Sequence, residues 1–321
     1  MVTYIVKRCL LIIPTLLGIA LIILLLLNYV PGSDPNSFSS DGGGDALDSF
    51  FDTVGMDDGF AARYIRYFYN LIVKHEFGPA NKGHSSIGTD LAYRLRYTLL
   101  LTGLSFLITF VVGIPLGIYS ALKRGKWQDQ VVSFLTLTLS SIPSYCLTLF
   151  LVIVFSLWLR LLPVSGIRDP GSFVLPTAVL SMGGIALTAR MARSAVIEVL
   201  DKPYITALRA KGLSERKIIF RHVLKNSLIP VVSTLNNLTA QMLCSTLVVE
   251  NFFSIPGLGA YLIAAVSVRN QHAILGCVLI ISLLLMIFGI VADIMCMIFN
   301  PKMRTQYTKA SQKPRRDNVE A

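Results

Sequence analysis

The chain has 321 residues and a formal net charge of +11; 54% of its residues are hydrophobic and only 15% are charged. A soluble domain has about 25% charged residues, so this composition excludes an ordinary soluble protein. The apolar residues gather into runs of roughly 20, the length that a helix needs to cross a bilayer. We therefore expect an integral membrane protein.

Six apolar runs predict an all-α, polytopic membrane protein with six transmembrane helices. The third run is longer than one perpendicular helix needs and contains Pro143, so we expect a kink or a tilt there. The first run follows Lys7 and Arg8, but it is too long for the core of a signal peptide, and we interpret it as an uncleaved span. The runs cover residues 9–30, 97–121, 131–160, 174–195, 228–249 and 273–299.

The distribution of Lys and Arg predicts the orientation, because these residues are enriched in cytoplasmic loops. With six spans and a cytoplasmic N-terminus, 20 of the 29 Lys and Arg residues lie on the cytoplasmic side. We therefore expect both termini to be cytoplasmic. The chain then divides into a first span (1–30), an extracytoplasmic loop (31–96), a five-span core (97–299) and a cytoplasmic tail (300–321).

The long loop contains an amphipathic segment that predicts a helix outside the membrane. Two interpretations remain open. The helix can lie on the lipid interface, held by its aromatic rings, or it can form a shelf for an extracytoplasmic partner. Its apolar positions are Phe60, Tyr64, Tyr67, Phe68, Leu71 and Ile72.

The sequence contains no motif typical of catalysis or of cofactor or metal binding. His75-Glu76 could begin a HExxH zinc site, but Pro79 occupies the place of the second His. There is no Walker A motif and no G-x-S-x-G motif, so we expect no enzyme activity, no cofactor and no metal. No stacking aromatic residues alternate with the basic ones in 201–226, which argues against a nucleic-acid partner.

Polar side chains form stripes at four-residue spacing inside two spans. Because polar groups in lipid must find partners, a stripe either bonds helices together or lines a polar path. For Thr136, Ser140, Ser144 and Thr148 in the third span we favour bonding between helices. For the fifth span, which has two carboxamides, we favour a translocation path. That stripe consists of Ser233, Asn237, Gln241 and Ser245.

Three further residues in the spans attract attention. Gly113 and Gly117 give the second span a small face that is typical of close helix packing. Asp293 is an acid inside an apolar run near its cytoplasmic end. It either reaches the membrane interface or takes part in a proton relay.

A polar, basic block at 201–226 predicts two short helices with a break between them. Asp201 is placed to cap the first helix, with Pro203 in its first turn. Gly212 is a natural stop, and Ser214 can cap the second helix. Apolar residues give the pair of helices one apolar face. Such a pair is typical of an element that docks into a groove on another protein. The alternative is an element that binds anionic lipid at the membrane surface.

Tyr204-Ile-Thr-Ala-Leu-Arg-Ala-Lys-Gly-Leu-Ser-Glu-Arg-Lys217, followed by Arg221-His222, resembles the EAA loop of bacterial ABC-importer permeases of the oligopeptide/dipeptide type. Thr206 stands where that family has the Glu of the motif's name, and Leu208 where it has a small residue. Other segments resemble the same family along the chain: Pro31-Gly-Ser-Asp-Pro35, Glu250 with Ile255-Pro-Gly-Leu-Gly259, and Asn300-Pro-Lys302.

The resemblance implies a permease subunit in the bacterial inner membrane, surrounded by membrane lipid. Its partners would be a second homologous permease, two cytoplasmic ABC ATPase subunits and an extracytoplasmic substrate-binding protein. The block 201–226 would be the loop that couples the permease to the ATPases. The coupling residues that the match implies are Thr206, Ala207, Arg209, Lys211, Gly212, Glu215, Arg221 and His222.

We expect the substrate to be a di- or oligopeptide, with nickel chelates, glutathione and sugars as alternatives within the same importer class. A stand-alone secondary transporter would call for internal repeats and charges at the membrane midplane. The sequence has no convincing repeat and no midplane charge. A simple membrane anchor would not need polar stripes in its spans.

Overall fold

The computed structural model describes residues 2–29, 60–74, 77 and 86–299, and every regular element among them is a helix. The predicted all-α fold is therefore confirmed. The α-helices are α1 (Val2–Tyr29), α3 (Phe60–Tyr69), α4 (Ile87–Leu122), α5 (Trp127–Ser141), α6 (Ser144–Leu151), α7 (Val174–Leu200), α8 (Pro203–Ala210), α9 (Glu215–Ile218), α10 (Leu224–Phe252), α11 (Leu258–Ser267) and α12 (Gln271–Phe299). Short π or 3₁₀ stretches adjoin them: η2 (Asn70–Lys74), η3 (Val152–Trp158), η4 (Pro170–Phe173) and η5 (Ile219–Val223).

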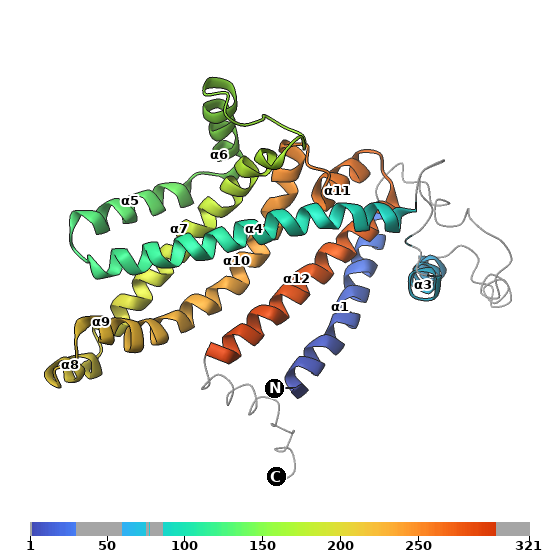
Figure 1. Cartoon of the computed structure of the whole chain (residues 1–321). Helices are drawn as coiled ribbons and strands as arrows, with labels where there is room; N and C mark the ends of the chain where they lie inside the picture. Colours follow the sequence, from blue (N-terminus) through green and yellow to red (C-terminus); the bar gives the residue numbers. More distant parts are fainter. Residues whose placement is uncertain (1, 30–59, 75–76, 78–85, 300–321) are drawn as a thin grey trace, which may run out of the picture.

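The long helices form a bundle with two distinct ends (Figure 1). At one end, which we call the loop end, α8 and α9 pack against the last turns of α4 and α7. At the other, which we call the far end, α11 packs against the end of α1 and the start of α12. The short helix α3 also lies at the far end. The basic block and α3, which is a described part of the long loop, therefore lie at opposite ends of the molecule.

Four of the described helices, α1, α4, α7 and α12, are long and apolar enough to cross a membrane. A fifth span results if the bent pair Trp127–Ser141 and Ser144–Trp158 counts as one. These spans agree with a polytopic membrane protein. The predicted count of six requires α10 as well, which is as long as α12 but carries the stripe of Ser, Asn and Gln side chains that lowers its hydropathy.

The third predicted span is broken at the proline. α5 ends at Ser141, α6 begins at Ser144, and the two helical parts meet at 105°. Pro143 has no backbone N–H to donate and its ring clashes with the preceding turn of a helix. The predicted kink is confirmed. The bend also divides the polar stripe of this run between two helices instead of leaving it on one face.

Glycines allow α4 and α7 to approach each other closely. A Cβ atom at Gly117 would overlap the backbone of Ala189 in α7, and one at Gly113 would lie 3.0 Å from the Cβ atom of Thr188. The packing role predicted for this pair of glycines is therefore confirmed. This contact holds together the two helices that support the loop end.

The amphipathic helix of the long loop is confirmed as α3, continued by η2. Its apolar face packs against this chain's own helices: Tyr67 is 4% exposed and lies in a cluster with Leu24 of α1 and Leu275 of α12. The Tyr64 hydroxyl donates a hydrogen bond to the Leu17 carbonyl at 2.9 Å. Tyr67 is thus not available to hold the helix on lipid, but Ile72 is 67% exposed, so both interpretations of this helix remain predictions.

The boundaries of that loop differ from the expectation. α4 begins at Ile87, ahead of the apolar run predicted at 97–121. The Ser86 hydroxyl accepts a hydrogen bond from the Thr89 N–H at 3.4 Å and so caps the helix. The segments 30–59, 75–76, 78–85 and 300–321 of the predicted loop and tail lie outside the described residues.

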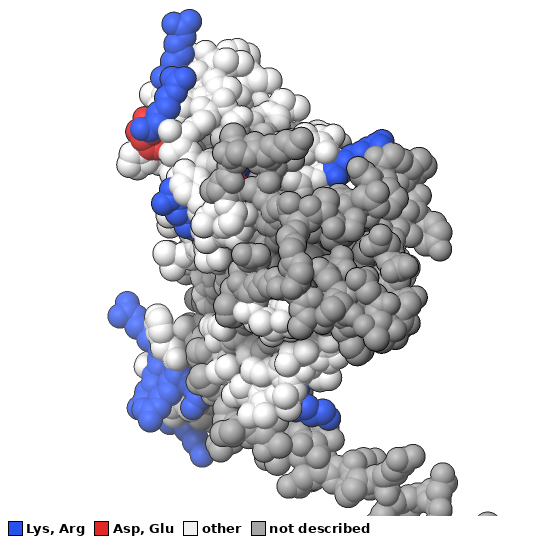
Figure 2. Space-filling model, turned by 90° about the vertical axis from the view of Figure 1, so that its right-hand side faces the viewer, with Lys and Arg blue, Asp and Glu red and all other residues white. Residues whose placement is uncertain are grey.

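The charged side chains are separated along the molecule. On the face drawn in Figure 2, Lys and Arg gather in an upper and a lower group, and the described surface between the two groups carries no charge colour. Such a band agrees with helices whose middle parts face hydrocarbon and whose ends face water.

Candidate functional site

The basic block forms the tip of the loop end, and its first helix differs in one detail from the prediction. α8 begins at Pro203, as expected for a proline in the first turn, but its N-cap residue is Lys202. Asp201 is not the cap. It ends α7 and accepts two hydrogen bonds from the Arg124 guanidinium, at 2.9 and 3.1 Å. This ion pair fastens the loop to the turn between α4 and α5.

Gly212 stops α8 as predicted. Its φ is +75°, a left-handed conformation that glycine adopts without a Cβ clash. The Gly212 N–H donates to the Arg209 carbonyl at 2.9 Å, and the Leu213 N–H donates to the Leu208 carbonyl at 3.3 Å. These two bonds form a Schellman motif, which satisfies the last carbonyls of the helix. The break in the loop is therefore a defined turn.

An ion pair closes this turn from the outside. The Arg209 Nε donates to Glu215 Oε1 at 2.7 Å. The hydrogen bonds from Arg209 hold the pKa of the Glu215 carboxyl below its ordinary value and raise the pKa of the Arg209 guanidinium. Both side chains are exposed, so the pair fixes geometry more than it adds stability.

The second helix of the block does not end at 226 as predicted. Ser214 occupies the N-cap position without a side-chain hydrogen bond, and α9 starts at Glu215. From there α9, η5 and α10 follow one another without a gap, up to Phe252. The loop is therefore one short helix joined by a tight turn to the extended start of a long one.

The apolar side of the loop faces the chain's own core, not an outside socket. Ile205, Ile218 and Val223 are fully buried against α4 and α7. Leu208 packs against the same cluster, so its departure from the family pattern affects internal packing. The outward face is mainly basic and polar, but it also exposes Phe220, which is 72% exposed. It carries the exposed side chains of Thr206, Ala207, Arg209, Lys211, Glu215 and Arg221, with Gly212 at the turn and His222 half-buried.

A buried ionic cluster supports this end of the bundle. Asp129, at the start of α5, is 4% exposed. It accepts hydrogen bonds from Arg193 Nε of α7 at 2.6 Å and from the Ser120 hydroxyl of α4 at 2.6 Å. The Gly125 N–H donates to the same carboxylate at 3.1 Å. Sequence reasoning missed this site, because nothing in a single sequence pairs residues this far apart.

The polar stripe of the fifth predicted span lies on the outside of the chain. Ser233, Asn237 and Gln241 are exposed on α10, and Ser245 is half-buried. The opposite face of α10 is buried, with Val232, Leu238, Met242 and Leu243 in the core. The stripe thus faces away from the core of the chain, and its two uses, bonding between helices and lining of a polar path, both remain predictions.

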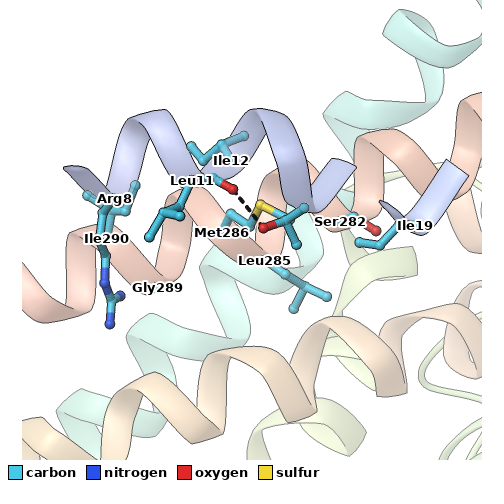
Figure 3. Close-up of a pocket in the computed structure, with 10 residues that line it drawn as sticks. Arg8, Leu11, Ile12, Ile19, Ser282, Leu285, Met286, Gly289 and Ile290 are labelled. Carbon is cyan, nitrogen blue, oxygen red and sulfur yellow. Dashed lines mark hydrogen bonds between the residues drawn. The ribbon is translucent and has the colours of Figure 1, made fainter. Parts of the chain in front are cut away.

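A groove of about 380 Å³ lies between α1 and α12 (Figure 3). Its lining is mainly apolar, and the Thr15 hydroxyl donates to the Leu11 carbonyl at 2.6 Å. Arg8 lies at one end of the groove and forms an ion pair with Asp293 of α12. Asp293 therefore has a cationic partner, which favours a structural role over a proton relay.

Among the described residues, no group of three or more His, Cys, Asp or Glu is placed to hold a metal.

Comparison with known proteins gives a match over more than half of the chain. Residues 113–305 match the family model described as "Binding-protein-dependent transport system inner membrane component". The chain belongs to this family. It is a multi-pass permease of an oligopeptide/dipeptide-type ABC importer in the inner membrane, as the resemblance of the EAA loop implied. The family is the inner membrane component of binding-protein-dependent transport systems, so it works with other parts of such a system.

Several relatives match almost end to end. The dipeptide transport system permease protein DppB of Bacillus subtilis is 32% identical over 308 residues, which cover 95% of this chain and 98% of that protein. The glutathione transport system permease protein GsiC of Escherichia coli K12 is 30% identical over 306 residues, covering 95% and 99%. Among solved structures, an inward-facing MetNI methionine ABC transporter aligns with a TM-score of 0.55 at 19% identity, over 65% of this chain and 96% of that one. This last likeness supports the fold alone.

Proposed function

We propose that this permease imports di- or oligopeptides. The similarity to a dipeptide permease along 95% of the chain supports this substrate class. The glutathione permeases among the relatives fit the same proposal, because glutathione is itself a small peptide. Nickel chelates and sugars are the remaining alternatives. Both termini are cytoplasmic in this proposal, and α10 is counted as the sixth span.

The outward face of the loop end would be the contact with the ATPases. Thr206, Ala207, Arg209, Lys211 and Arg221 are exposed there, and the turn at Gly212 gives the face a fixed shape. The core beneath the loop joins it to the ends of α4 and α7. A docked ATPase that moves would therefore move these helices as well. Coupling of this kind needs no catalytic residue in the permease.

The remaining partners are assigned to the other exposed surfaces. A second homologous permease would cover the polar face of α10 formed by Ser233, Asn237, Gln241 and Ser245, and the substrate would pass between the two subunits. The exposure of this face in the single chain supports that placement. One of the two ATPase subunits of the importer would bind this loop end, and an extracytoplasmic binding protein would deliver the substrate at the far end.

The substrate class is tested by transport. The complete importer is reconstituted in vesicles with ATP inside the compartment that holds the ATPases, and uptake of a labelled dipeptide is measured. We expect ATP-dependent uptake that unlabelled di- and oligopeptides inhibit. Inhibition by a nickel chelate or a sugar, with none by peptides, would replace the peptide proposal by that alternative.

The coupling role is tested at Gly212. A Gly212→Val permease should insert normally but lose the ATPase subunits on purification, because a β-branched residue resists the left-handed conformation by about 1–2 kcal/mol or more. Gly212→Asn is the matched control, since asparagine tolerates that conformation. Full ATPase stoichiometry and full substrate-stimulated hydrolysis with Gly212→Val would show that 201–226 is not the coupling element.

A further inference from the structure

A buried carboxylate joins three helices at the far end. Glu250 lies in the last turn of α10 and is fully buried. Its Oε1 accepts a hydrogen bond from the Thr98 hydroxyl of α4 at 2.6 Å, and its Oε2 accepts one from the Gly259 N–H of α11 at 2.7 Å. The Ala260 N–H donates to the same oxygen at 3.4 Å. A buried group with this many partners holds its neighbours in one geometry.

These bonds supply the cap that α11 lacks. The first N–H groups of a helix have no partner inside the helix, and a side chain of the N-cap residue usually accepts one of them. The N-cap of α11 is Gly257, which has no side chain. The Leu258 N–H donates instead to the Thr98 hydroxyl at 2.9 Å. Two side chains from two other helices therefore hold the start of α11.

The glycines at this point serve the close approach. A Cβ atom at Gly257 would overlap the Glu250 carboxyl group, and one at Gly259 would overlap the backbone of Leu247. The start of α11 is thus pressed against the last turns of α10. Small residues are needed here for contact between the elements, since neither glycine has a positive φ.

Two further contacts extend this junction. The Arg94 guanidinium of α4 lies 4.2 Å from the centre of the Tyr261 ring of α11. One turn below Thr98, the Thr102 and Thr246 hydroxyls of α4 and α10 approach to 3.4 Å. Because separating these groups would leave buried polar atoms without partners, the far halves of α4 and α10 and all of α11 are expected to move as one body.

The opposite end of α10 is the candidate coupling loop. The helical chain runs from Glu215 to Phe252 without a gap, and Figure 1 shows α8 and α9 at one end of this run and α11 at the other. Pro230 lies within the run and the helix continues on both sides of it. A displacement of the loop therefore has a direct mechanical path to the far end.

We propose that Glu250 and Thr98 are positioning residues that fasten α11 to the end of α10, so that α11 moves with the coupling loop. This inference rests on the proposed function of the loop. α11 then acts as the element at the far end through which ATPase movement is expressed. Val266 of α11 and the following Val268 are exposed apolar side chains at the far end. Movement of α11 would therefore change the apolar surface that is exposed there.

The test follows the movement of α11 directly. The complete importer, built on a cysteine-free permease, receives a single cysteine at Val266 of α11 or at Val248 of α10, both exposed in the single chain. Val248 lies on the α10 face assigned to the path between the two permeases, so its labelling reports access to that path. The rate of maleimide labelling is measured without nucleotide and with ATP and vanadate. In the otherwise unaltered complex we expect the nucleotide to change both rates by about fivefold, at the low end of usual conformational couplings.

Thr98→Val is the decisive variant, because it keeps the shape of the side chain and removes the hydroxyl that bridges Glu250 and Leu258. We expect the nucleotide response at Val266 to be lost and the response at Val248 to persist. Thr98→Ser restores the hydroxyl and should restore the response. Thr109→Val is the matched control: it removes a buried hydroxyl of α4 that donates to the Ser181 carbonyl of α7 at 3.4 Å, outside this junction, and it should leave the response unchanged. Glu250→Gln should weaken the response at Val266 in the same way.

Two results would overturn the inference. One is a Thr98→Val complex in which Val266 responds as in the unaltered complex. The other is an unaltered complex that retains its ATPases and hydrolyses ATP while labelling at Val266 stays constant. Failure of the proposed function of the loop has a different signature, since the Gly212→Val permease would then keep its ATPases and its substrate-stimulated hydrolysis.

Discussion

The loop end contains a left-handed glycine, a buried ion pair and an exposed ion pair. Gly212 was predictable because its role is local: a helix stop needs a left-handed residue, and glycine is the least strained one there. The ion pair of Asp129 with Arg193 was not predictable, since its partners lie 64 positions apart. The same holds for Asp201, whose predicted local cap gave way to a distant partner, Arg124.

The buried pair should matter for stability more than the exposed one. Arg193→Leu leaves Asp129 as a buried carboxylate that keeps, among the described residues, the Ser120 hydroxyl and the Gly125 N–H as hydrogen-bond donors. We expect a loss of about 3 kcal/mol, the low end for breaking a buried pair. Denaturation of the purified permease in detergent measures this loss.

Arg124→Leu is the matched control for that prediction. It breaks the pair with Asp201, whose two side chains are 57% and 59% exposed. An exposed pair contributes less than about 1 kcal/mol. Equal losses for the two variants would mean that the Asp129 site does not support this end of the bundle.

At the scale of helices, hydrophobic periodicity predicted the elements better than their ends. The runs of apolar residues correspond to α1, α4, α7, α10 and α12. Periodicity could not show that α9 continues into α10. Where a helix leaves the membrane its residues change from apolar to polar, although its backbone continues without a break. It also could not show which way the apolar side of the loop faces, because that depends on the ends of α4 and α7.

The exposed polar face of α10 should affect transport without affecting assembly. Asn237→Leu together with Gln241→Leu removes both carboxamides from the surface assigned to the partner permease. We expect uptake to fall by about tenfold, equivalent to about 1.4 kcal/mol in the barrier, with the complex still purified at full stoichiometry. Uptake assays in reconstituted vesicles measure the effect.

Val111→Leu is the control for added bulk, since Val111 is 63% exposed on another helix, α4, away from the stripe on α10. The assignment of a path would be abandoned if the double variant transported at the same rate and with the same substrate range as the unaltered permease. The stripe would then serve only contact between subunits.

For the whole molecule, the orientation in the membrane follows from charge and from the separation of the two ends. The loop end contains the basic block, and α3 and α11 lie at the opposite end (Figure 1). Basic residues are retained on the cytoplasmic side during insertion. The structure places the basic residues relative to the helices, but the direction of the bundle across the membrane comes only from this rule.

Labelling of intact cells tests that direction. Single cysteines are introduced in a cysteine-free permease at Ile72, which is 67% exposed at the far end, at Lys217 in α9, and at Ser311 in the tail. An impermeant maleimide should label Ile72 in spheroplasts and should label Lys217 and Ser311 only after the membrane is opened. Lys217 and Ser311 lie on the same side of the membrane only if an even number of spans separates them. In the six-span arrangement these spans are α10 and α12, so the same experiment tests α10 as a span. Labelling of Ser311 from the outside with Lys217 still protected would remove α10 or α12 from the set of spans, and labelling of all three from the outside would reject the six-span arrangement.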